Sequence, residues 1–205
     1  MGYHVDIAFC VDVTRSMSPF IERAQETILA FPQDLSLKLL EKDRVTTQIR
    51  VRVIAFGDSN LDPDPIKASS FFTLLPPEQT SEFSDSVRSL AVSGSGPSMG
   101  LEAFEIALRS GWTQDGNRQR HVIVVLTNST PRPELLDSLQ HMWETGTDTT
   151  IGETAKRLVL VAPDVHPWNQ LGDGLSRTVF LPAASRGFAF DDEYEAVLEL
   201  CCNAV

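Results

Sequence analysis

The sequence predicts an α/β fold built around a mostly parallel sheet with one antiparallel edge strand. Segments rich in β-branched and apolar residues alternate with segments of helical period as far as the C-terminus. Several strand segments are largely apolar, as expected for strands covered on both faces of a sheet. Only a loop separates the segments 48–56 and 69–75, so these two strands are free to pair antiparallel.

The N-terminal half supplies the first elements of this fold. Residues 5–11, VDIAFCV, are largely apolar and form a predicted central strand. Ser18 precedes a proline, which is typical of a helix N-cap, and apolar residues spaced by three and four extend that helix to about Lys42. Residues 48–56 begin with polar and apolar residues in alternation, which indicates a strand near an edge, and 69–75 is the short strand beside it.

The C-terminal half continues the alternation. Residues 121–127, HVIVVLT, form the clearest central strand in the sequence. Pro133 stands near the first turn of a predicted helix, where a proline is well tolerated. The remaining predicted elements are helices over 77–91, 99–109, 131–143 and 191–204 and strands over 157–163 and 178–183.

Composition narrows the class of protein. The chain has 205 residues and a formal net charge of −11, so most of its surface repels a phosphate backbone and nucleic-acid binding is disfavoured. Its 3 cysteines, two of them adjacent, give no disulfide framework. The first residues show no secretory signal, and no apolar run is long enough to span a membrane. We therefore expect a single cytoplasmic domain over residues 1–205 that contacts neither nucleic acid nor membrane.

Three loops at the predicted carboxyl ends of strands carry short side chains that end in oxygen. They are DVTRS at 12–16, GSGPS at 94–98 and TNSTP at 127–131. Ligands of an open parallel sheet bind at this end of the strands. Carboxylate, hydroxyl and amide oxygens are hard donors, which suit Mg²⁺, Mn²⁺ or Ca²⁺ better than softer metals. These loops form a candidate divalent-cation site.

Longer stretches carry a resemblance to a known family. In chain order they are HVDIAFCVDVTRSM at 4–17, RVRVIAF at 50–56, GLEAFEIAL at 100–108, HVIVVLTNSTP at 121–131 and RLVLVAPDVHPW at 157–168. Together they resemble a von Willebrand factor type A (vWA) domain over nearly the whole chain, and the similarity is closest to stand-alone prokaryotic-type members.

The resemblance implies a doubly wound, Rossmann-like sheet with helices on both faces and a metal-ion-dependent adhesion site (MIDAS) at its top. The first family motif, Asp-x-Ser/Thr-x-Ser, falls on Asp12, Thr14 and Ser16. The second loop of the family contributes Thr or Asp, and Ser95 stands at that position here. The third contributes Asp, which is Asn128 in this sequence. Asp12 is the only carboxylate of this set, so we expect a partly degenerate site for Mg²⁺, with Mn²⁺ or Ca²⁺ as alternatives.

The family resemblance also implies a function. It predicts a non-catalytic protein-interaction module whose partner docks at the loops 12–18, 93–98 and 128–132, with a partner carboxylate completing the metal shell. A metal-free vWA scaffold is the alternative within the same fold. Resemblance to prokaryotic-type members extends the prediction to a larger assembly with an ATPase or a defence-type effector.

A serine hydrolase is the alternative from another class. Residues 96–100, Gly96-Pro97-Ser98-Met99-Gly100, fit the G-x-S-x-G nucleophile motif with Ser98 as the nucleophile. Such a motif joins a buried strand to a helix, whereas the residues before it, EFSDSVRSLAVSGS, are mainly of helical pattern. Short motifs of this kind often occur by chance.

Several residues near these loops have simpler structural interpretations. Thr14 and Ser16 have the chemistry of helix caps, and Asn128 that of a turn residue. Ser93 and Ser98 are alternative second-loop donors. The acids of the loop 57–65, namely Asp58, Asp62 and Asp64, lack the spacing of a calcium loop and are expected to be solvated. Trp168 is expected to pack at a helix or loop edge, and because it lies near the predicted top face, an exposed contact patch is the alternative.

Overall fold

The computed structural model describes residues 2–60, 63–94, 98–116, 118–183 and 190–203, and its centre is a single sheet. The strand order is β3-β2-β1-β5-β6-β7, and β4 also pairs with β2. Five of these strands run parallel, and β3 and β4 run antiparallel to β2. The strands are β1 Tyr3–Asp12, β2 Thr46–Phe56, β3 Ile66–Ala68, β4 Phe72–Leu75, β5 Gln119–Leu126, β6 Lys156–Ala162 and β7 Thr178–Pro182.

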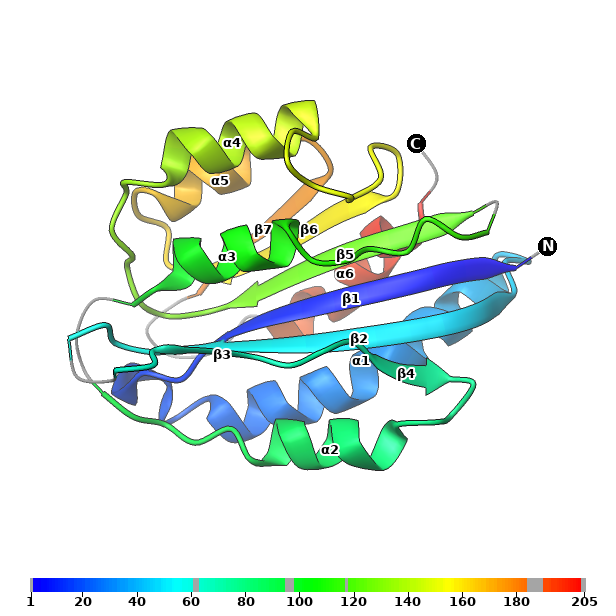
Figure 1. Cartoon of the computed structure of the whole chain (residues 1–205), viewed down its shortest axis with the longest axis horizontal. Coiled ribbons are helices and arrows are strands. Elements are labelled where there is room, and N and C mark those ends of the chain that lie inside the picture. The colour runs from blue at the N-terminus through cyan, green and yellow to red at the C-terminus, as the bar shows by residue number, and fades with distance from the viewer. Residues whose placement is uncertain (1, 61–62, 95–97, 117, 184–189, 204–205) are drawn as a thin grey trace.

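Helices cover both faces of this sheet, as Figure 1 shows. The helices α1, α2 and α6 pack on one face, and α3, α4 and α5 pack on the other. The helices are α1 Ile21–Glu41, α2 Thr80–Arg88, α3 Gly100–Leu108, α4 Leu136–Thr145, α5 Trp168–Gly174 and α6 Phe190–Cys202, with a short 3₁₀ helix, η1, over Arg15–Met17. The predicted α/β class, with a doubly wound and mostly parallel sheet, is confirmed.

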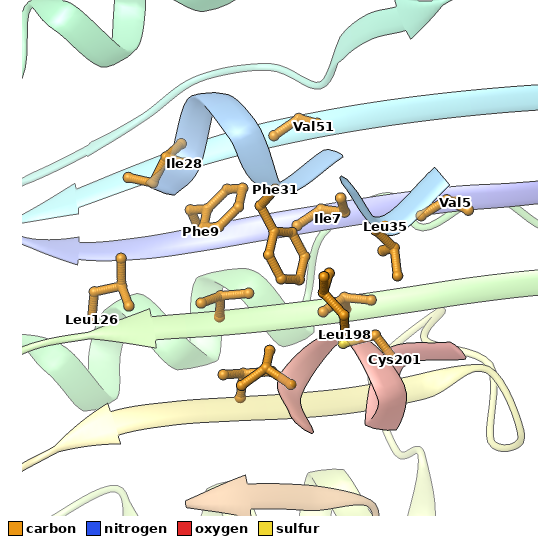
Figure 2. Packing of buried hydrophobic residues seen from close by; sticks show 14 of the residues in the cluster. Val5, Ile7, Phe9, Ile28, Phe31, Leu35, Val51, Leu126, Leu198 and Cys201 are labelled. Atoms are coloured by element: carbon orange, nitrogen blue, oxygen red, sulfur yellow. The ribbon is translucent and has the colours of Figure 1, made fainter. Parts of the chain in front are cut away.

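Side chains along each strand point alternately to the two faces of the sheet, so the apolar residues form two separate clusters. In β1, Val5, Ile7 and Phe9 belong to the apolar cluster under α1 and α6, whereas Ala8 and Cys10 belong to the cluster under α3. A strand with apolar residues at both sets of alternate positions must lie inside the sheet, as the sequence predicted for 5–11. Figure 2 shows the first cluster, in which side chains of β1 meet Ile28, Phe31 and Leu35 of α1 and Leu198 and Cys201 of α6.

Two predicted helix starts are wrong. α1 begins at Ile21, with Phe20 as its N-cap, instead of beginning after a cap at Ser18. Residues 15–17 form η1, so Ser18 and Pro19 lie in the turn between two helices. α4 begins at Leu136, whose backbone N donates a hydrogen bond to the carbonyl O of Pro133, so this proline precedes the helix. In both cases the chain makes an additional turn at the top of the sheet before the helix begins.

The sheet edge and α5 also differ from the prediction. The antiparallel edge has two segments, because β3 precedes the expected β4 and both pair with β2. α5 is a short helix that the sequence pattern did not indicate. Among the described residues, no helix is both long and apolar enough to cross a membrane.

Candidate functional site

The candidate site begins with a fixed carboxylate at the end of β1. Asp12 is the last residue of β1 and is fully buried. Its Oδ1 accepts a hydrogen bond from the backbone N of Thr14 at 2.7 Å, and its Oδ2 accepts one from Oγ1 of Thr127 at 2.6 Å. Thr127 directly follows β5, the parallel neighbour of β1. Adjacent strand ends therefore hold both carboxylate oxygens in place.

Three hydroxyl groups lie together beyond this carboxylate. We call Thr14, Ser16 and Ser129 the hydroxyl cluster. Oγ1 of Thr14 lies 2.8 Å from Oγ of Ser16, and Oγ of Ser129 lies 3.1 Å and 3.0 Å from these two atoms. Ser16 donates its hydroxyl hydrogen to Oδ1 of Asn128 at 2.6 Å. Since a serine has a single hydroxyl hydrogen, Ser16 accepts in its contacts with the other two hydroxyls.

The cluster opens to solvent on one side. Asp12 and Thr14 are buried, Asn128 and Ser129 are partly exposed, and Ser16 is exposed. The amide of Asn128 also donates from Nδ2 to the carbonyl O of Ser16 at 2.7 Å, which ties the third loop to the first. A ligand from solvent therefore meets Ser16 first and the partly exposed Asn128 and Ser129 next, whereas the carboxylate of Asp12 is buried.

The separations within the cluster suit a shared cation. Mg²⁺ takes octahedral ligands at about 2.0–2.1 Å, so neighbouring ligand oxygens stand about 3.0 Å apart. The hydroxyl oxygens lie 2.8–3.1 Å apart, within a few tenths of an ångström of that value. The donors are the carboxylate, hydroxyl and amide oxygens that hard cations prefer, with one formal negative charge, that of Asp12. In the part of the chain that the structure describes, no three His, Cys, Asp or Glu side chains gather as a metal site.

The structure brings together four of the residues named from the sequence and adds a fifth. Asp12, Thr14, Ser16 and Asn128 are linked in this order by hydrogen bonds, the first of them to the backbone N of Thr14. Ser95 lies outside the described residues, as do Gly96 and Pro97. Ser129 was not named as a donor, although the sequence contained a signal for it, since a third hydroxyl directly follows Asn128 in the same loop.

Helix capping does not explain the two hydroxyls of the first motif. Thr14 is the N-cap of η1 but makes no side-chain capping bond, and α1 starts at Ile21 with no side-chain cap either. The hydroxyl partners of Thr14 and Ser16 come from one another and from the third loop. The capping interpretation is therefore wrong.

Trp168 supports the third loop from beneath. Its side chain is fully buried, and Nε1 donates to the carbonyl O of Ser129 at 2.9 Å. Gly100, the first residue of α3, lies against the indole: a Cβ at this position would be 2.6 Å from Cζ2 of Trp168. Trp168 thus packs at the start of α5, as expected, and the alternative of an exposed contact patch is wrong because the indole is buried.

The second loop enters beside the first. The backbone N of Ser93 donates to the carbonyl O of Val13 at 2.7 Å, and that of Arg15 donates to the carbonyl O of Gly94 at 2.8 Å. Gly94 has φ +72°, a left-handed conformation that favours glycine. Ser93 is exposed, so its side chain is not enclosed among the cluster hydroxyls.

Asp58 is a second buried carboxylate near these loops. It is 2% exposed, and Oδ1 accepts a hydrogen bond from the backbone N of Asn60 at 2.8 Å. A Cβ at Gly94 would lie 3.0 Å from Cβ of Asp58, so the second loop packs closely against it. The prediction of a solvated acid is wrong here, whereas Asp64 is exposed and Asp62 lies outside the described residues. The sequence contained a signal for this residue, because Asp58 lies just after the end of β2 and Asp12 lies at the end of β1, the neighbouring strand.

Ser98 lacks the surroundings of a hydrolase nucleophile. Residues 89–94 form no strand, Ser98 is 3% exposed, and its Oγ has no hydrogen-bond partner among the described residues. His121 lies at the opposite end of the sheet, where Nδ1 accepts from the backbone N of Gly152 at 2.8 Å and Nε2 lies 3.1 Å from the carbonyl O of Thr113. Burial lowers the pKa of His121 to about 4. The described residues before the motif thus form no strand, and among the described residues no base is hydrogen-bonded to Oγ of Ser98.

Comparisons with known proteins agree with this fold. The model of the von Willebrand factor type A domain family matches residues 6–156. The fold is similar to a structure of proximal thread matrix protein 1 from the mussel byssus with a zinc-occupied MIDAS motif, at 15% identity and a TM-score of 0.60 over 98% of this chain and 46% of that chain. A further structure of that mussel protein gives 15% identity and a TM-score of 0.59, over 98% of this chain and 47% of that chain. This chain thus spans about half the length of these structures, and comparison with curated protein sequences gives no match.

Proposed function

The chain belongs to the von Willebrand factor type A domain family, and from this premise we propose that it is a non-catalytic module that docks a partner protein at the top of the sheet. The docking surface consists of the described residues of loops 12–18, 93–98 and 128–132. The observation that carries the proposal is the hydroxyl cluster, which lies at a solvent-accessible edge above a buried carboxylate.

A divalent cation is the proposed link between this domain and its partner. Thr14, Ser16, Ser129 and Asn128 would hold it, with Asp12 supplying the negative charge beneath. One similar structure is described with zinc in its MIDAS motif, which supports a divalent cation in general. We propose Mg²⁺, with Mn²⁺ or Ca²⁺ as alternatives, because the donors here are all oxygens. The bound cation supplies a positive centre that a partner carboxylate can approach.

The low charge of the donor set gives the partner a role. A single carboxylate leaves a divalent cation with excess positive charge, and ligand charge is one of the factors that set cation affinity. An acidic residue of the partner would supply the missing charge, so cation and partner bind more tightly together than apart. A cytoplasmic location remains a prediction from the sequence composition, and an assembly with an ATPase or a defence-type effector remains a prediction from the family resemblance.

Thermal unfolding with added cations tests the proposal. A cation that binds only the folded chain stabilises it by about 2.7 kcal/mol at a hundredfold excess over its dissociation constant. At about 2–4 °C per kcal/mol for a chain of this length, the midpoint should rise by about 5–10 °C. Asp12→Ala should abolish this rise, whereas Asp85→Ala, which removes an exposed acid of α2, should keep it.

Partner capture then separates the two forms of the proposal. Capture that is lost on chelation and in Asp12→Ala supports metal-bridged docking. Capture that survives both supports the metal-free scaffold. A wild-type chain that shows neither a cation-induced shift nor any partner dependent on the three loops would overturn the proposed function.

A further inference from the structure

A cavity of about 360 Å³ lies beside the proposed docking site, on the α2 side of the sheet. Val53 and Ala55 of β2 line it from the sheet, and Lys67 of β3 lines it from the edge strand. The C-terminal end of α2 and the segment after it contribute Ser86, Ser89 and Ser93 among others. Its volume lies within the range of about 300–1,000 Å³ that is usual for ligand pockets.

The cavity and the docking site share a wall. Val13 and Ser93 both line the cavity, and the backbone N of Ser93 donates to the carbonyl O of Val13. Val13 directly precedes Thr14 of the hydroxyl cluster, and Ser93 precedes Gly94, whose carbonyl accepts from Arg15. A segment that occupies the cavity therefore touches the back of two loops whose other side carries the candidate site.

The charge of the cavity is opposite to that of the molecule. The chain has a net charge of −11, yet the charged side chain that lines this cavity is a cation, Lys67, and none of the lining residues is acidic. Lys67 is exposed and makes no ion pair or hydrogen bond within the part of the chain that the structure describes. An uncompensated ammonium group next to serine hydroxyls suits a carboxylate, whereas most of the remaining surface repels one.

We propose that this cavity receives an acidic side chain from the same partner segment that docks at the hydroxyl cluster. The inference rests on the proposed function for the identity of the partner, and it adds a second contact that does not require the cation. Lys67 faces the carboxylate, the apolar walls contact its methylene groups, and the shared wall fixes the distance between the two contacts. The partner would then carry two acidic positions, one for the cation and one for Lys67.

Binding of a fluorescein-labelled decaglutamate peptide to the full chain, followed by anisotropy at low salt with Mg²⁺ present, tests this inference. Lys67→Glu should weaken binding by about tenfold or more, which corresponds to about 1.4 kcal/mol. Lys67→Arg should bind nearly as wild type. The matched control is Arg109→Glu, which makes the same change of charge at an exposed residue after α3, on the other face of the sheet.

A second variant tests the cavity without altering charge. Ala91 lines the cavity and is exposed, so Ala91→Phe should fold normally and fill part of the space. Ala91→Phe should weaken binding of the peptide by a factor similar to that expected for Lys67→Glu. The inference is overturned if both variants bind like wild type, if Arg109→Glu weakens binding as much as Lys67→Glu does, or if the wild-type chain does not bind the peptide.

Two further arms separate this inference from the proposed function. If EDTA and Asp12→Ala leave binding unchanged while the Lys67 variants act as expected, metal-bridged docking fails and the cavity contact stands. If EDTA and Asp12→Ala abolish binding while Lys67→Glu has no effect, the cavity contact fails and metal-bridged docking stands. Inorganic phosphate that displaces the peptide completely at low millimolar concentration would identify a small-anion pocket and overturn the assignment to a partner side chain.

Discussion

The contact between Gly100 and Trp168 links the core to the candidate site, and one substitution tests that link. Gly100 is buried at the start of α3, and a Cβ there would lie 2.6 Å from Cζ2 and 2.9 Å from Cη2 of Trp168. Both distances are too short for carbon atoms in contact. Gly100→Ala must therefore move the indole or the start of α3, and the indole donates the hydrogen bond that holds the carbonyl of Ser129.

The expected loss of stability is the balance of three effects. Forcing a methyl group into a packed core costs about 1–3 kcal/mol. Weakening the bond from Trp168 to Ser129 costs about 1 kcal/mol more. Alanine in place of glycine within a helix stabilises the folded state by up to about 1 kcal/mol, which offsets part of this loss. The net loss is about 1–4 kcal/mol, which lowers the unfolding midpoint by about 2–16 °C in a chain of this length.

Urea unfolding followed by tryptophan fluorescence and circular dichroism measures this loss. The matched control is Gly111→Ala, where a Cβ meets no heavy atom within 4 Å, and it should be neutral or slightly stabilising. Because Ser129 loses its support, Gly100→Ala should also show a smaller cation-induced shift than Gly111→Ala. If the two variants have equal stability and equal cation response, Trp168 does not couple the core to the third loop.

Three other predictions concern the core and the C-terminal helix. Burial lowers the pKa of His121 from 6.5 to about 4, so between these values the unfolded chain binds a proton that the folded chain does not. The free energy of unfolding should then fall by up to about 3 kcal/mol from pH 7.5 to pH 4.5, and urea unfolding of His121→Gln should show a correspondingly smaller fall. Arg157 donates from Nε to the carbonyl O of Leu200 and from Nη2 to that of Asn203; Arg157→Met should therefore cost about 1–3 kcal/mol in the same assay, and an unchanged midpoint would show that the end of α6 does not need this cap. Burial raises the pKa of all three thiols, so a thiol reagent at pH 8 should label them only after unfolding, and rapid labelling of the native chain would contradict their burial at Cys10, Cys201 and Cys202.

The sequence predicted the parts of the fold that depend on local pattern. The largely apolar runs that became β1 and β5 had to lie inside the sheet, because a strand with apolar residues on both faces needs cover on both. Helix starts were less certain, because Ser18 and the following proline also suit a turn, and the chain uses them between η1 and α1. Local residue preference could not distinguish a helix cap from this additional turn.

Contacts between distant segments could not be predicted in the same way. The hydroxyl that fixes Asp12 belongs to Thr127, which is 115 residues away, and this pairing depends on β1 and β5 being neighbours. An exposed patch at Trp168 was an alternative because the residue lies near the predicted top face, yet its indole is buried and donates a hydrogen bond to a carbonyl of the third loop. Asp58 was expected in solvent because the residues after it have turn chemistry, and only the packing of Gly94 against it reveals its burial.

Asn128→Asp separates the two roles that the third loop has in this site. In the absence of cation it should destabilise the fold by about 1 kcal/mol, because the bond from Nδ2 to the carbonyl O of Ser16 is lost and a second carboxylate comes near Asp12. With cation present the added charge should tighten binding by at least about tenfold, equivalent to about 1.4 kcal/mol, so the cation-induced shift grows. Gln33→Glu makes the same change from amide to carboxylate at an exposed position of α1, and it should alter neither quantity. If Asn128 had only a structural role, Asn128→Asp would lower stability without tightening cation binding. A cation-induced shift equal to that of wild type would therefore show that this residue does not belong to the cation site.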